Sequence, residues 1–277
     1  MIRVIFLFIF IPASLAANFI GMNNGARSLS MGDAFVALSD ETSAIFYNPA
    51  GLARVNNFHL IVSRQNLYGI SDLNTDMVAM SLPTPILRSG VAVQRISLVD
   101  VYTEKIFYFS VAGIVKISKV PLRFGISFKH ESAKVENYYS PYDPNNFDID
   151  LGLLLDISEH LFLGYSVKHL LEPDFKFISE SESIDQKHTA GLCYRWRKSV
   201  NFLADHIWIS DQSQWNFGSE IWFFDVFAAR LGLLDNKLTT GFGLSTDRWS
   251  IDVAVLTHNE LGSTYRVSFG YKQGRRN

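Results

Sequence analysis

The sequence contains little cysteine, little charge and no long apolar run after its first residues. Its 277 residues include one cysteine, Cys193, which excludes an internal disulfide and any zinc site built on paired cysteines. We expect this lone thiol to behave as a small buried hydrophobe. Charged residues make up 19% of the chain, against roughly 25% in an average soluble protein, and the formal net charge is −2. Because phosphate binding needs a basic surface, we expect no nucleic-acid partner.

The first residues have the pattern of an export signal. Arg3 provides a short positive region, residues 4–11 form an apolar run, and Ser14 and Ala16 are small residues suited to a cleavage site. The run is well short of the ~20 residues that a spanning helix needs, and no later stretch reaches that length. We therefore predict a signal peptide over residues 1–16. If the mature chain lies in a membrane, it must do so as a closed barrel.

Aromatic and apolar residues are abundant, and they alternate with polar ones. Hydrophobic residues make up 48% of the chain, and 22 Phe and 11 Tyr are present. In residues 122–129 and 264–271, every second position is apolar and the positions between are polar or glycine. Such period-2 alternation indicates strands with one apolar and one polar face. The segments are about ten residues long, as in outer-membrane barrels, whereas soluble sheets most often have strands of about 5–6 residues.

The alternation predicts an all-β fold: a transmembrane antiparallel up-and-down β-barrel of about fourteen strands over residues 57–277. The predicted strands begin near Phe58, Asp76, Gly90, Glu104, Leu122, Phe147, Leu161, Lys187, Val200, Gln214, Val226, Leu238, Trp249 and Leu261. The two longest connections, residues 133–146 and 172–186, both follow odd-numbered strands and so belong at the same end of the barrel. The five Trp residues fall near strand ends, where barrels carry a girdle of aromatic residues.

Charged residues on the polar faces are predicted to line the lumen. A Lys or Arg that faces lipid at mid-depth costs roughly 2–4 kcal/mol, so the interior is the favoured place for these side chains. The predicted lumen-facing residues are Arg123, Lys129, Asp148, Asp150, Asp156, Lys168, Lys187, Arg195, Glu220, Arg230, Asp252 and Arg266. Their mixed signs indicate mutual ion pairing; a selective polar pore is the alternative.

No pattern of catalytic or cofactor-binding residues is present. The sequence lacks a nucleophile elbow, a P-loop, a His-Glu-X-X-His motif and an EF-hand loop. The seven His residues are scattered through the chain, so a metal site would require them to meet in the folded protein. We expect no enzymatic activity, no cofactor and no metal.

The segment between the signal peptide and the first strand, residues 17–56, has a different composition. This N-terminal segment is rich in Gly, Ala and Ser and contains GARSLSMGDAFVALSD (25–40), followed by ETSAIFYNPAGLA (41–53). The motif resembles the start of the PorV/PorQ family of outer-membrane proteins, which is related to the FadL/TodX transporters of hydrophobic solutes. The resemblance covers roughly a tenth of the chain. It implies a hatch or plug folded in or under the lumen, with the motif residues Gly25, Arg27, Met31, Gly32, Asp33, Asp40, Asn48, Pro49 and Gly51.

The resemblance implies two functions for a protein of the outer membrane of a Gram-negative (diderm) bacterium. The first is a partner in type IX-like protein secretion or surface attachment, which would bind secreted proteins or subunits of the secretion machinery. Tyr138, Tyr139, Tyr142, Phe175 and Phe177 are the candidate contacts for that role. The alternative is a FadL-like channel for hydrophobic small molecules such as fatty acids. A purely structural barrel remains a third possibility, and the motif itself can be a latch without a ligand.

Overall fold

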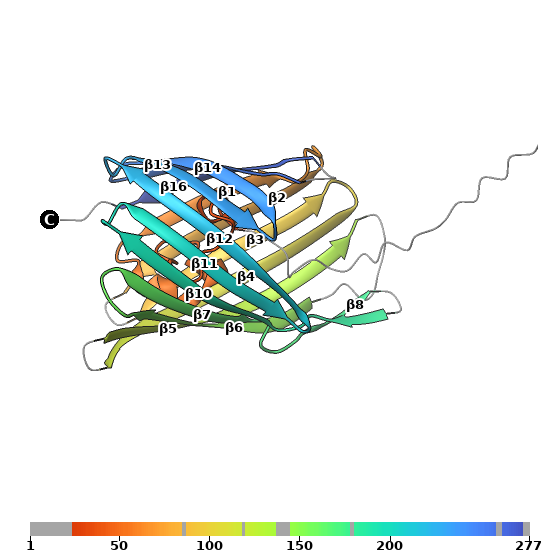
Figure 1. The fold of residues 1–277 in the computed structure, drawn as a ribbon. Helices are drawn as coiled ribbons and strands as arrows, with labels where there is room; N and C mark the ends of the chain where they lie inside the picture. The colour runs from red at the N-terminus through yellow and green to blue at the C-terminus, as the bar shows by residue number, and fades with distance from the viewer. Residues whose placement is uncertain are drawn as a thin grey trace, which may run out of the picture.

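The chain folds into one closed antiparallel β-barrel (Figure 1). The structure is a computed structural model and describes residues 24–84, 87–117, 120–136, 145–177, 180–258 and 262–273. The predicted signal peptide lies outside these residues. Around the barrel, each barrel strand is hydrogen-bonded to the barrel strands that precede and follow it in the chain, with β7 paired to β10, and β1 closes the ring against β16.

The fourteen barrel strands are β1 (His59–Asn66), β2 (Leu73–Pro83), β3 (Arg88–Leu98), β4 (Tyr102–Ile117), β5 (Val120–Val135), β6 (Asn145–Asp156), β7 (Leu161–Lys168), β10 (Lys187–Trp196), β11 (Val200–Ile209), β12 (Gln212–Phe223), β13 (Phe227–Leu234), β14 (Lys237–Ser245), β15 (Trp249–Leu256) and β16 (Thr264–Lys272). A separate two-stranded sheet is formed by β8 (Asp174–Phe177) and β9 (Glu180–Ser183). The N-terminal segment contains α1 (Ala26–Leu29), α2 (Ala44–Tyr47) and the 3-10 helix η1 (Pro49–Arg54).

The fourteen-stranded barrel predicted from alternation is confirmed, and each predicted strand corresponds to one barrel strand. The β8–β9 hairpin was not predicted. Its strands are four residues each, too short for alternation to distinguish them from a loop.

The two ends of the barrel differ in their connections. We name the end where β1 starts at His59 and β16 finishes at Lys272 the turn end, and the opposite end the loop end. Both long connections, 136–144 and 169–186, lie at the loop end as predicted, and the latter contains the β8–β9 hairpin. Two other connections at the loop end are only two residues long: 210–211 and 235–236. Asp235 and Asn236 both have positive φ, 46° and 63°, which suits a tight primed turn.

The outer face of the barrel is apolar. Phe109, Phe128 and Leu231 are 47–52% exposed, while the residues on either side of each in the strand are buried inside. Trp196, Trp215 and Trp249 are exposed near strand ends, and Trp249 packs on Tyr271 with ring centroids 4.6 Å apart. Trp222 departs from the expected girdle. It pairs across the sheet with the fully buried Ala228 and lies 5.6 Å from the Arg230 guanidinium, so it faces inward.

The main hydrophobic core lies inside the barrel. Met31, Phe35, Leu38, Ile45 and Phe46 of the N-terminal segment pack there against apolar side chains of the wall. Helix α1 contacts β14, β15 and β16, whereas η1 contacts β3, β4, β5 and β6, so the segment crosses the lumen from one wall to another (Figure 1). Within the described residues, no helix is both long and apolar enough to cross a membrane.

The apolar outer face predicts a depth-dependent cost of introduced charge. Phe128 lies in the middle of β5 and Phe147 near the loop end of β6, and both are exposed. In lipid vesicles, Phe128→Arg should lower the free energy of unfolding by about 2–4 kcal/mol, and Phe147→Arg by about 0–1 kcal/mol. Urea titration of the reconstituted protein measures both. Equal effects at the two positions would mean that the outer face does not meet lipid.

Candidate functional site

The lumen wall is lined by glycines where the N-terminal segment passes. A Cβ atom at Gly232 would lie 2.2 Å from the amide nitrogen of Gly32, and one at Gly152 would lie 2.1 Å from Oδ1 of Asn48. Real Cβ atoms do not approach other atoms this closely, so the backbones of wall and segment meet only because these positions are glycine. The other wall glycines in comparable contact with the segment include Gly125, Gly164, Gly191, Gly218 and Gly241.

Side chains of the wall bind backbone N–H groups of the segment. The Asp205 carboxylate on β11 accepts hydrogen bonds from the amides of Phe35 (2.9 Å) and Val36 (3.0 Å). On β14, Thr239 accepts from the amide of Gly32 at 2.9 Å. The Gly32 amide also donates to Leu29 O at 3.1 Å. The buried Phe35 and Val36 amides belong to no strand or helix ladder, so for them the wall provides the partner that water would otherwise supply.

Arg27 joins the segment to a buried ion-pair network. Its Nε lies 2.8 Å from Glu220 Oε1 on β12, and its Nη1 lies 2.6 Å from Asp40 and 3.3 Å from Glu41. Glu220 also binds Nε of Arg230, and Nη1 of Arg230 lies 2.7 Å from Asp252 Oδ1. Burial lowers the pKa of Arg27, but the surrounding carboxylates outweigh it and raise that pKa well above its ordinary value. Burial raises the pKa of Glu41, but Arg27, His59, the Ser43 hydroxyl and Lys272 together outweigh it and the net shift is downward.

Tyr47 and Asn48 fix the fold of the segment itself. The Tyr47 hydroxyl donates to Asp33 Oδ1 at 2.8 Å and accepts from the Asn24 amide at 2.9 Å. Burial raises the pKa of Asp33, and it also raises the pKa of Tyr47. The Asn48 side chain donates to Val36 O at 3.1 Å and to Leu153 O of β6 at 2.9 Å, and its Oδ1 accepts from Ala50. The turn before Pro49 is thereby tied both to the segment and to the wall.

A second buried charge cluster surrounds Lys129 of β5. Its Nζ lies 3.2 Å from Glu131, 2.7 Å from Asp148 and 2.8 Å from Asp150. His169 Nδ1 is 2.8 Å from Asp148 and 3.2 Å from Nζ. Burial and the nearby ammonium lower the pKa of His169. Glu131, Asp148 and His169 are spaced as metal ligands would be, but the ammonium already contacts all three, so the group is best described as an ion-pair cluster.

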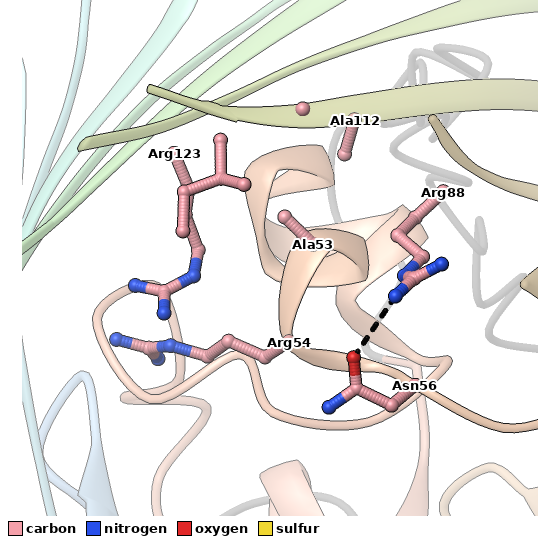
Figure 2. A pocket seen from close by; sticks show the side chains of 8 residues that line it. Ala53, Arg54, Asn56, Arg88, Ala112 and Arg123 are labelled. Atoms are coloured by element: carbon pink, nitrogen blue, oxygen red, sulfur yellow. Dashed lines mark hydrogen bonds between the residues drawn. The ribbon is translucent and has the colours of Figure 1, made fainter. Parts of the chain in front are cut away.

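A cavity of about 390 Å3 lies at the turn end, between η1 and strands β3, β4 and β5 (Figure 2). Its lining residues are Ala53, Arg54, Asn56, Arg88, Ala112, Gly113, Ile114 and Arg123. Arg54 and Arg123 both donate to the Asp156 carboxylate, the former at 2.7 Å. Arg54 also donates to the carbonyl oxygens of Ala37 and Leu38, which links the cavity to the N-terminal segment.

The predicted site residues are distributed over these features. Among the motif residues, Gly25 (φ 95°), Gly32 (φ 66°) and Asp33 (φ 55°) have left-handed backbone, and Met31, Pro49 and Gly51 are buried. Among the predicted lumen residues, Lys129, Asp148, Asp150, Glu220, Arg230, Asp252 and Arg266 are buried, whereas Arg123, Asp156, Lys168, Lys187 and Arg195 are partly exposed. Lys168 lies 5.7 Å from the Tyr47 ring centroid, and Arg195 donates to Asn201 at 3.0 Å.

Several residues that form these sites were not predicted. Asp205 lies in a segment that alternates poorly, and Arg54 lies in the N-terminal segment outside the motif. Glu131 lies inside β5 but next to the predicted connection 133–146, and His169 directly follows β7. Inward glycines on the polar faces are the sequence feature that would have indicated where the segment packs. Of the candidate contact residues at the loop end, Phe175 is buried, and Tyr138, Tyr139 and Tyr142 lie outside the described residues.

The hydrogen bonds of Asp205 generate a test of how the segment is held. Asp205→Ala removes the acceptor of two buried amides, so their hydrogen exchange should accelerate by roughly thirtyfold, equivalent to about 2 kcal/mol. Asp205→Asn keeps one carbonyl oxygen for both amides and should change exchange far less. Residue-resolved exchange at Phe35 and Val36 measures this. Equal acceleration in both variants would contradict the role assigned to the acceptor oxygen.

No protein-family model matches the sequence, and no curated protein matches it. Solved structures match in fold. A deltaS2 mutant of TodX, a monoaromatic hydrocarbon channel, has a TM-score of 0.67 at 11% identity, covering 91% of this chain and 99% of its own. The P. putida toluene transporter TodX gives 0.60 at 11% identity (92% and 99% covered), and a Pseudomonas aeruginosa FadL homologue gives 0.58 at 11% (91% and 98%). The chain therefore has the barrel fold of FadL/TodX-type channels, and the PorV/PorQ resemblance of its N-terminal motif stays a prediction.

Proposed function

We propose that this protein is an outer-membrane channel that passes hydrophobic small molecules, such as fatty acids or monoaromatic hydrocarbons. The observation that carries the proposal is a closed fourteen-stranded barrel with the fold of hydrocarbon channels and a separate N-terminal segment seated across its lumen. The apolar outer face suits lipid as the surrounding medium. The activity is passage of a solute and not its chemical conversion.

The filled lumen determines how passage would occur. The segment meets wall glycines at backbone contact and buries Phe35, Leu38 and Phe46 in the interior core. A solute that follows the barrel axis must therefore displace part of the segment. Its anchors differ in kind: a patch of apolar packing, two amides bound to Asp205 and the Arg27 ion pairs. The ion pairs and hydrogen bonds can exchange partners with water as the segment shifts, which makes the segment a candidate hatch.

The second candidate, a PorV/PorQ-like partner in type IX-like secretion, has one observation in its favour, the N-terminal motif. The side chains of that motif that make polar contacts are turned into the lumen, where Arg27 binds Glu220 and Asn48 binds Leu153. Packing inside the barrel accounts for these residues without an external protein. The fold likeness to hydrocarbon channels therefore favours the solute channel.

Tethering the segment to the wall tests the proposal. Oγ1 of Thr42 in the segment lies 3.0 Å from Oγ of Ser81 on β2, so cysteines at these two positions would bring their sulfur atoms close to disulfide-bonding distance. Thr42→Cys/Ser81→Cys, in a Cys193→Ala background to prevent mispairing, should cross-link segment and wall. Uptake of radiolabelled oleate and toluene would be measured in a Gram-negative host lacking its own fatty-acid channel. We expect oxidation to lower uptake at least tenfold and a reductant to restore it.

The two single-cysteine variants are the controls, because each carries the same local change without the tether. Unchanged uptake in a fully cross-linked sample would show that the segment is a fixed latch. No uptake above the empty host, even for the unmodified protein, would overturn the channel function itself.

A further inference from the structure

The cavity at the turn end has a composition that the passage of neutral hydrocarbons does not require. Three of its eight lining residues are arginines, contributed by η1 (Arg54), β3 (Arg88) and β5 (Arg123). Figure 2 shows the Arg54 and Arg123 side chains close together on one side of η1 and Arg88 on the other, hydrogen-bonded to Asn56. Three separate elements thus bring guanidinium groups to one space.

The charges around this cavity do not balance. Among the described residues, Asp156 is the carboxylate bound to these arginines, and it is shared by Arg54 and Arg123. Arg88 donates to two neutral oxygens, Asn56 Oδ1 at 3.2 Å and the carbonyl of Thr84. The neighbouring residues outside the description, 85–86 and 118–119, contain no Asp or Glu. Two positive charges are therefore left without a carboxylate.

Hydrogen-bond donors are also left over. A guanidinium has five N–H donors in a planar fork that matches a carboxylate. Nε of Arg123 is buried and has no hydrogen-bond partner among the described residues, while the same side chain is 14% exposed. Arg54, in contrast, already donates to Asp156 and to two backbone carbonyls. Arg123 and Arg88 are thus the arginines with capacity for an added acceptor.

The remaining lining defines the rest of the ligand. Ala53, Ala112, Gly113 and Ile114 offer an apolar wall, and the volume of about 390 Å3 falls in the range of small-molecule pockets. The first residue of β3, Arg88, pairs with Ala112 of β4. Among the described residues, Gly113 to Ile117 of β4 therefore extend beyond β3 and pair with β5 alone. The cavity lies at this step, and Asn56 and the half-exposed Ile114 open it to the turn end.

We propose that this cavity binds an organic anion, a carboxylate with a short apolar body, held by Arg88 and Arg123 with its apolar part against Ala112 and Ile114. This inference rests on the proposed function, because it assigns the proposed channel a binding site for acidic hydrophobic solutes at the turn end. Arg54, which binds Ala37 and Leu38 of the N-terminal segment, places this site beside the proposed hatch.

Equilibrium dialysis of radiolabelled hexanoate against the full-length protein in micelles tests the site, with protein-free micelles as the blank. We expect saturable binding that acetate, hexanol and inorganic phosphate each displace at least tenfold less effectively than unlabelled hexanoate. Arg88→Gln and Arg123→Gln should each weaken binding at least tenfold. Arg64→Gln, at a 68% exposed side chain on β1, is the matched control and should leave binding unchanged.

Arg88→Gln keeps the test decisive because Arg88 binds no carboxylate, and its loss leaves no buried acid unpaired. Heat-modifiable migration on SDS gels checks that each variant is folded. Wild-type affinity in folded Arg88→Gln, or displacement by phosphate as effective as by hexanoate, would overturn the proposal. If the arginine variants lose hexanoate binding but keep toluene uptake, the site is supported independently of the channel function. If the unmodified protein binds no hexanoate although the tether blocks its uptake of solutes, the site is overturned and the channel function stands.

Discussion

The structure depends on the contact between the N-terminal segment and the glycine-lined wall. A barrel of fourteen strands encloses more space than its own inward side chains fill, and here the polypeptide itself fills it. Backbone placed there must find hydrogen-bond partners away from bulk water. Gly232 and Gly152 let the segment come close to the wall. Asp205 and Thr239 of the wall then accept hydrogen bonds from amides of the segment. The hydrophobic core, the Arg27 network and the cavity at the turn end all take their positions from this seating.

The charges follow from the same constraint. The buried ionisable side chains lie on the inner face of the wall, where each needs a partner because the surroundings solvate charge poorly. Two networks result. One joins Arg27, Glu220, Arg230 and Asp252 and includes the segment, and the other joins Lys129 to three carboxylates and lies within the wall and the adjoining connection. Movement of the segment would break the first network and leave the second in place.

Alternation was enough to predict the barrel and the number of its strands, because a lipid-facing wall imposes a strict period of two over long segments. It was not enough to predict the sites. Asp205 meets Phe35 across 170 residues of chain, and Arg54, Arg88 and Arg123 meet from three elements, so their proximity depends on register and on the path of the segment. The Trp222 side chain turns inward because its strand position, not its residue type, sets its direction. The N-terminal motif predicted a set of segment residues, but the contacts that these residues make with the wall depend on packing that the sequence alone does not reveal.

The location of the unbalanced arginines separates two possible roles for the segment. If it were only a latch, charge at its end would be expected to pair fully, as Arg27 does with Glu220, Asp40 and Glu41. At the other end, Arg54 shares a single carboxylate with Arg123 and also binds the carbonyls of Ala37 and Leu38, two residues that neighbour the amides held by Asp205. An anion held by Arg88 and Arg123 would compete with Asp156 for Arg123, and Asp156 is also the carboxylate that binds Arg54. Because Arg54 holds the carbonyls of Ala37 and Leu38, a bound solute would perturb the stretch of segment that crosses the lumen, which would couple recognition to passage without any additional moving part.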